Sequence, residues 1–214
     1  MRIYFARHGK TDGNTKRFIP SAQEPLNADG KGDAEFLVRR LEATPIEMVF
    51  SGNFTRAKET ATLIAEKKDI PLTILPELNE LSRGDHLHGK YYADAGTKEE
   101  LDAWWLHLEA PDGAAIAKEM GHETYADLKS RAEKVLETLR QRPEECISVV
   151  THSATLRMLL GLIVFRERLT PAMFKDLFFN LDMRTTGISI AEYTEEKGWR
   201  MLVWNDCAHL ADPR

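Results

Sequence analysis

The chain has 214 residues, of which 43% are hydrophobic and 29% are charged, and its formal net charge is −5 at pH 7. This composition is ordinary for one globular domain with a sizeable core. The negative charge excludes a global basic field, so nucleic acid and anionic membranes are poor candidates as partners. Any site that binds an anion must therefore be a local cluster of positive side chains.

The cysteines and the apolar runs indicate a cytoplasmic protein. Cys146 and Cys207 form no CxxC pair and no disulfide framework, which fits a reducing compartment. The first residues, MRIYFARHG, are too polar for a signal peptide. The longest apolar run, residues 158–165, is far shorter than the ~20 residues that span a bilayer.

Strand-like apolar runs alternate with helical stripes along the chain. In chain order the pattern predicts a strand at 2–6, a helix at 30–41, a strand at 46–50, a helix at 56–67, a weak strand at 72–75, a helix at 124–139, a strand at 146–150, a helix at 154–165 and a hairpin at 187–193 and 199–204. This alternation predicts a three-layer α/β/α sandwich with a mostly parallel central sheet.

One segment interrupts the alternation. Leu101, Trp104, Trp105 and Leu108 follow helical spacing, and the segment 91–122 around them reads as a cap-like helical insertion over the sheet. We expect it to belong to a single domain spanning 1–214 and to contribute to substrate specificity. The hairpin near the end of the chain offers an edge that could pair with another copy. The sequence therefore leaves open whether the protein forms a homodimer.

Polar stretches follow three of the predicted strands. They are ARHGKT (6–11), SGNFTRA (51–57) and THSATLR (151–157). In a parallel sheet the carboxyl ends of strands meet at one edge, where ligands bind. The guanidinium groups of Arg7 and Arg56 match phosphate oxygens. A helix that opens at Ser153 adds backbone amides that favour an anion. The sequence therefore predicts a phosphate pocket.

Two histidines at the same edge indicate chemistry as well as binding. Nearby arginines keep an imidazole neutral near pH 7, and a neutral imidazole is a nucleophile. Either His8 or His152 could attack phosphorus and carry the phosphoryl group, while the other donates hydrogen bonds to its oxygens. A leaving alkoxide needs a proton, for which Glu80 in LPELNELSRG is the candidate and Glu77 the nearest rival.

Five stretches in order carry a family resemblance. They are ARHGKTDGN (6–14), PLNADGKGDA (25–34), SGNFTRAKETA (51–61), LNELSRGDHLHG (78–89) and VVTHSATLR (149–157). Together they resemble the motifs of the histidine phosphatase superfamily, which has the phosphoglycerate mutase-like fold. The resemblance covers nearly the whole chain.

The resemblance implies a role for each matching residue. His8 would be the nucleophile that becomes phosphohistidine, and Glu80 would protonate the leaving group and then activate water. The phosphoryl group would be held by Arg7, Arg56 and His152. The remaining candidate substrate contacts are Asn14, Ser153, Lys10 and Thr11. No metal and no cofactor is implied.

The favoured function is a metal-independent phosphomonoesterase that acts on a small phosphorylated metabolite through a phosphohistidine. A phosphoglycerate-type mutase and a non-catalytic phospholigand-binding module are the alternatives. A further alternative is a metallohydrolase, because Asp85, His86 and His88 have a spacing that can bind a divalent metal. No second cluster of ligands is evident in the sequence, and a metal would not explain the two arginines.

Overall fold

A mixed six-stranded sheet, in the order β3–β2–β4–β1–β5–β6, runs through the part of the chain that the computed structural model describes, residues 1–108, 110 and 112–210. The strands are β1 (Arg2–Arg7), β2 (Met48–Ser51), β3 (Leu72–Ile74), β4 (Cys146–Thr151), β5 (Ile188–Thr194) and β6 (Gly198–Asp206). The pairs β1–β4, β2–β4 and β2–β3 are parallel, whereas β5 and β6 are antiparallel to their neighbours. The mostly parallel sheet expected from the sequence is confirmed.

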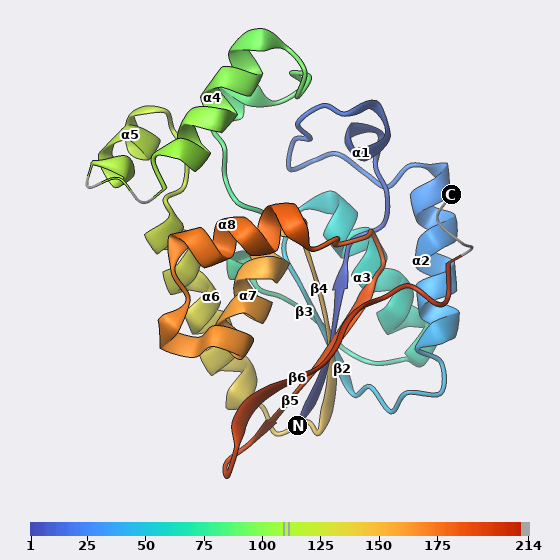
Figure 1. Ribbon diagram of the computed structural model, residues 1–214. Helices are drawn as coiled ribbons and strands as arrows, with labels where there is room; N and C mark the ends of the chain where they lie inside the picture. The colour runs from blue at the N-terminus through green and yellow to red at the C-terminus, as the bar shows by residue number, and fades with distance from the viewer. Residues whose placement is uncertain (109, 111, 211–214) are drawn as a thin grey trace.

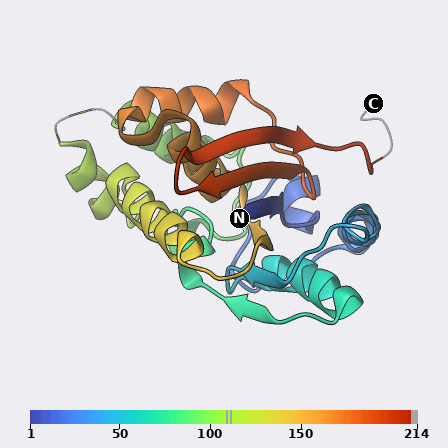
Figure 2. The same cartoon turned by 90° about the horizontal axis from the view of Figure 1, so that it is seen from below.

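Helices cover both faces of this sheet (Figure 1). They are α1 (Asp12–Lys16), α2 (Ala28–Arg40), α3 (Thr55–Lys68), α4 (Ala95–Leu106), α5 (Gly113–Glu119), α6 (Tyr125–Arg140), α7 (Ser153–Phe165) and α8 (Pro171–Asn180), with short 3₁₀ turns at Pro76–Leu78, Asp85–Leu87 and Arg166–Arg168. Figure 2 shows the sheet edge-on, with α2 and α3 on one side and α6, α7 and α8 on the other. The predicted α/β/α sandwich is therefore correct.

Alternating side chains of the strands build two cores. Ile3 and Phe5 of β1 belong to the core under α6 and α7, while Ala6 belongs to the core under α2 and α3. This follows from the period of two residues along a strand. Helix α7 is buried along most of its length, since it lies between the sheet and other helices. Among the described helices, none is both long and apolar enough to cross a membrane.

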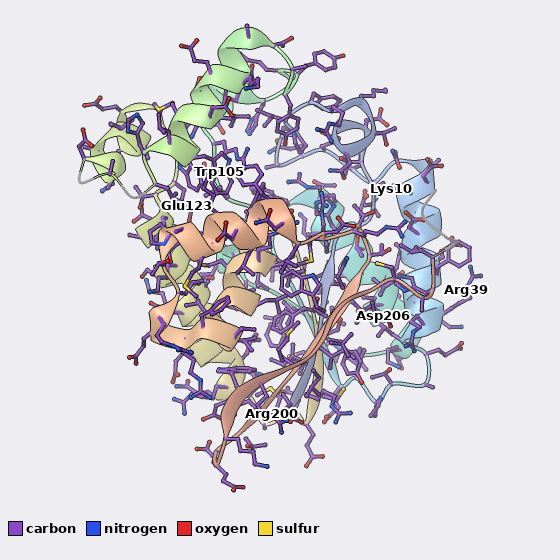
Figure 3. The ribbon with its side chains drawn as sticks, viewed as in Figure 1. Lys10, Arg39, Trp105, Glu123, Arg200 and Asp206 are labelled. Atoms are coloured by element: carbon purple, nitrogen blue, oxygen red, sulfur yellow. The ribbon has the colours of Figure 1, made fainter. Side chains whose placement is uncertain are left out.

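The inserted segment stands above the edge at which β1, β2 and β4 end (Figure 1). Its helix α4 is fixed to α8 through Trp105, whose ring centroid lies 4.7 Å from that of Phe178 and 4.9 Å from that of Phe179. Figure 3 shows Trp105 between these two helices. The insertion expected at 91–122 thus contains α4 and α5; its residues 109 and 111 lie outside the described part.

The amino end of α2 packs directly on the loop after β1. A Cβ atom at Gly30 would lie 2.0 Å from the Lys10 carbonyl oxygen, and one at Gly9 would lie 2.5 Å from the Gly30 oxygen. Both distances are too short for any side chain. The two glycines therefore let α2 approach the His8 loop backbone to backbone.

Gly30→Ala is expected to lower the free energy of unfolding by about 1–3 kcal/mol, because backbone atoms must shift to admit the methyl group. Gly32→Ala is the matched control in the same helix, where an added Cβ meets nothing within 4 Å. It should raise the stability by up to about 1 kcal/mol through helix propensity. Denaturant unfolding of both variants measures the difference, and equal effects would refute the close packing.

Candidate active site

The register of β1 and β4 brings the two histidines together. Arg7 pairs with Thr151, so the next residues, His8 and His152, emerge side by side at the carboxyl edge. The His8 amide donates to the Thr151 carbonyl at 2.9 Å, and the two imidazole centroids lie 5.0 Å apart. The sheet therefore places both rings at one point.

His8 is held with one ring nitrogen engaged and the other facing a guanidinium. Its Nδ1 lies 2.7 Å from the Gly9 carbonyl oxygen. Because a carbonyl only accepts, Nδ1 carries the proton and Nε2 keeps its lone pair. Nε2 accepts from Arg56 Nε at 3.3 Å. Burial, reinforced by the charges of Arg56 and Arg7, lowers the pKa of His8 well below its ordinary value. At neutral pH the ring is therefore uncharged, and its Nε2 keeps a lone pair.

His152 is completely buried, and neither of its ring nitrogens has a hydrogen-bond partner among the described residues. The ring of Phe54 packs against it at a centroid distance of 5.2 Å. Burial, followed by the proximity of His8 and the arginines, lowers its pKa well below the ordinary value. Buried polar groups are normally paired, so this ring has donor and acceptor capacity available for a ligand.

Arg7 and Arg56 supply positive charge at the site, and the Glu80 carboxylate lies close enough to act on both guanidinium groups. Arg7 Nη1 donates to the Met183 carbonyl at 2.7 Å, and Arg56 Nη1 donates to the Ser21 carbonyl at 2.8 Å. Neither guanidinium forms an ion pair with an acid among the described residues. Burial lowers the pKa of both groups, but arginine stays cationic at neutral pH. A buried cation, Arg56, and a half-buried one, Arg7, beside His8 favour a bound dianion.

Glu80 lies at the start of α7. Its Oε1 accepts from the amides of Leu81 at 2.9 Å, Ala154 at 3.0 Å and Thr155 at 3.3 Å. Among the described groups, Oε2 has only a weaker contact of 3.3 Å with the Ala154 amide. Two amides at the start of α7, those of Ala154 and Thr155, are therefore occupied by the Glu80 carboxylate, whereas the Ser153 amide is not among its donors. Its rival Glu77 is exposed, and it is not among the cavity-lining residues.

Hydrogen bonds from other elements position the Glu80 segment. Thr151 Oγ1 donates to the Leu78 carbonyl at 2.6 Å, and Thr155 Oγ1 donates to the Asn79 carbonyl at 2.6 Å. Arg131 of α6 also donates to the Asn79 carbonyl, at 2.8 Å. Thr151 at the end of β4 and Thr155 in α7 thus fix the carboxylate relative to the histidines.

The other candidate contacts have different surroundings. Asn14 lines the cavity, and its Oδ1 accepts from the Thr11 amide at 3.1 Å, which leaves its amide NH₂ as the available donor. Ser153 also lines the cavity, with Oγ accepting from Arg157. Lys10 lies at the mouth but pairs with Asp33 at 3.0 Å, so its charge is partly offset. Thr11 is fully buried as the N-cap of α1 and is not one of the described residues that line the cavity.

These side chains surround a cavity of about 1000 Å³. Sequence reasoning expected the insertion to contribute to the outer wall but missed the part that α8 and the segment after it provide. That wall includes aromatic and basic side chains from the insertion, α8 and the loops beside them, namely Arg17, Arg83, Tyr92, Trp105, Phe178, Phe179 and Arg184. A Thr-Pro start at Thr170 was the sequence signal that could have revealed α8.

The metal set proposed from the sequence does not assemble. His86 Nε2 contacts Glu100 Oε1 at 2.7 Å rather than His88, and Glu100 also contacts His122. His88 Nδ1 instead lies 3.7 Å from Asp85. The H-x-H spacing therefore gives no Asp85–His86–His88 site.

Comparison with known proteins agrees with this geometry. The sequence profile of the histidine phosphatase superfamily (branch 1) matches residues 3–207. An adenosylcobalamin/alpha-ribazole phosphatase from Salmonella typhimurium is 29% identical over 75% of this chain and 78% of the relative. A probable phosphoglycerate mutase GpmB from Salmonella paratyphi A is 28% identical over 100% of this chain and 96% of the relative.

Among solved structures, YhfR of Bacillus stearothermophilus superposes with a TM-score of 0.82 at 25% identity, covering 98% of this chain and 99% of that one. The two proteins therefore share the same fold over almost the whole of both chains. With a profile match over nearly its whole length, the chain belongs to branch 1 of the histidine phosphatase superfamily.

Proposed function

We propose that the protein is a metal-independent phosphomonoesterase that works through a phosphohistidine on His8. The observation that carries the proposal is the neutral His8 ring, whose Nε2 faces Arg56 beside the half-buried guanidinium of Arg7. A tetrahedral phosphoryl group at this point would meet a nucleophile and two guanidinium groups together.

The first step forms a bond between phosphorus and His8 Nε2 and breaks the ester P–O bond. Arg7, Arg56 and His152 stabilise charge on the phosphoryl oxygens. The carboxyl of Glu80 gives its proton to the leaving oxygen, which departs as an alcohol. Its Oε2 suits this role because Oε1 is anchored by three backbone amides.

The second step returns the site to its starting state. The Glu80 carboxylate takes a proton from a water molecule, whose oxygen attacks phosphorus as the P–N bond breaks. Inorganic phosphate leaves and His8 regains its Nε2 lone pair. Over the two steps every proton and charge is accounted for by the substrate, water, His8 and Glu80.

The outer wall supports a small phosphorylated metabolite as substrate. Trp105, Phe178 and Phe179 offer an apolar side, while Arg83 and Arg184 offer positive charge for a second anionic group. The full-length likeness to a probable phosphoglycerate mutase keeps a mutase as the second candidate, in which the phosphoryl group returns to substrate. A non-catalytic binding module is disfavoured, because every residue proposed as nucleophile, phosphate ligand or acid lies at the site.

Release of inorganic phosphate from a panel of phosphorylated metabolites, measured with EDTA present, tests the proposal. We expect at least one compound to be hydrolysed with EDTA present, because no metal ion takes part in the proposed chemical steps. Interconversion of the phosphoglycerates without net phosphate release would establish the mutase instead. If the protein binds phosphate but neither releases it from any compound nor interconverts the phosphoglycerates, the binding module is the remaining function.

A further inference from the structure

A second cluster of side chains lies outside the catalytic cavity. His86 lies in the turn Asp85–Leu87, Glu100 lies in α4, and His122 lies between α5 and α6. Their reactive atoms converge, since His86 Nε2 and His122 Nε2 lie 2.7 Å and 2.8 Å from the same oxygen, Glu100 Oε1. None of the three is among the described residues that line the cavity containing His8.

The chemistry of this donor set is that of a transition-metal site. Two imidazoles and one carboxylate bind zinc and similar ions in proteins. One potential ligand atom from each residue lies within 4.8 Å of the others. Around a tetrahedral zinc ion with bonds of about 2.0–2.1 Å, ligand atoms lie about 3.3 Å apart. The two distances from Glu100 Oε1 to the histidine nitrogens, 2.7 Å and 2.8 Å, therefore need to lengthen by only about 0.5 Å to admit an ion.

Exposure varies across the cluster in a way that suits ion entry. The His122 side chain is 1% exposed, that of Glu100 is 22% exposed and that of His86 is 48% exposed. One side of the cluster is thus anchored in the protein and the other meets solvent. Water can complete the coordination on the open side.

We propose that His86, Glu100 and His122 bind a divalent transition-metal ion that fastens the insertion to the rest of the chain. Glu100 belongs to the insertion's first helix, and the two histidines lie on either side of that helix in the sequence. The same helix contributes Lys98, Leu101 and Trp105 to the cavity wall. The ion would therefore fix the position of that wall without touching phosphorus.

The affinity should be moderate. Ligand histidines usually donate their second ring nitrogen to a carboxylate or carbonyl, which supports the metal bond. His122 Nδ1 is buried and has no such partner among the described residues. Because losing such support costs about 10–100-fold in affinity, we expect binding in the micromolar range rather than tighter.

The test is zinc binding to untagged protein that has been stripped with EDTA, measured by equilibrium dialysis and by thermal unfolding without substrate. Wild type should bind one equivalent, and its Tm should rise by about 5 °C or more at a zinc concentration 100 times Kd. His86→Ala should lose both effects and should fold as wild type does, because the His86 side chain is exposed. Glu100→Gln should weaken binding at least 10-fold.

His88→Ala is the matched control, because it removes the other imidazole of the H-x-H pair but no proposed ligand. It should bind zinc as wild type does. Absence of stoichiometric binding by wild type, undiminished binding by His86→Ala, or loss of binding in His88→Ala would each overturn the proposal. Neither readout depends on turnover. A protein without phosphatase activity could therefore still bind zinc at this site, and a protein that binds no zinc could still be a phosphatase.

Discussion

His8→Ala is expected to reduce phosphate release by about 10⁴-fold or more, since covalent catalysis loses its nucleophile. The backbone hydrogen bond from the His8 amide to Thr151 does not involve the side chain and should remain. The two guanidinium groups and His152 also stay, so the variant should still bind inorganic phosphate. The measurement is single-turnover phosphate release with the best substrate of the panel.

A covalent readout distinguishes loss of chemistry from loss of structure. Wild type mixed with labelled substrate and quenched in alkali should carry an acid-labile phosphoryl group, whereas His8→Ala should carry none. His88→Ala is the control, because it removes another imidazole that lines the same cavity. It should keep at least about a tenth of the wild-type rate, as expected of a residue outside the reacting group. A His8→Ala variant with near-normal turnover would disprove the phosphohistidine mechanism.

The centre of the site could be predicted because it depends on sheet geometry. Arg7, His8 and His152 follow apolar strands, and parallel strands end at a common edge. In the structure Arg7 pairs with Thr151, so the residues that follow β1 and β4 lie side by side as expected. Arg56 was predictable for the same reason, since it comes shortly after β2 and opens α3.

The outer wall could not be predicted because it depends on contacts between distant segments. Arg7 donates to Met183, a residue 176 positions away, through a backbone carbonyl that no side-chain pattern reveals. Short α8 was missed, and with it Phe178 and Phe179. Likewise, the partner of His86 proved to be Glu100, 14 residues along the chain, rather than the neighbouring His88.

The contact between Glu80 and the start of α7 could not be predicted from the local sequence. A helix that begins at Ser153 does offer backbone amides to an anion, as expected from the sequence. The 3₁₀ turn Pro76–Leu78 and the threonine contacts bring a carboxylate of the protein itself to those amides. The helix end therefore orients the proposed acid, and the arginines, His152 and the Ser153 amide remain the proposed contacts of the phosphoryl group.

Glu80→Gln is expected to slow hydrolysis of alkyl phosphates by about 10²–10⁴-fold, because their leaving oxygen must be protonated. The substitution is isosteric, and the amide oxygen of glutamine can keep the acceptor contacts with Leu81, Ala154 and Thr155. What it removes is the acidic proton. The fold and phosphate binding should therefore be preserved.

Nitrophenyl phosphate separates the two roles proposed for Glu80. A nitrophenolate leaves without protonation, so Glu80→Gln should form the phosphoenzyme at nearly the wild-type rate and release about one equivalent of nitrophenol in a burst. The steady state that follows should be slow, because water then lacks its base. Glu77→Gln is the control, since Glu77 is exposed three residues earlier and should behave as wild type. Equal losses in the burst and on alkyl phosphates would move the acid to another carboxyl, with Asp85 at the cavity wall the next to test.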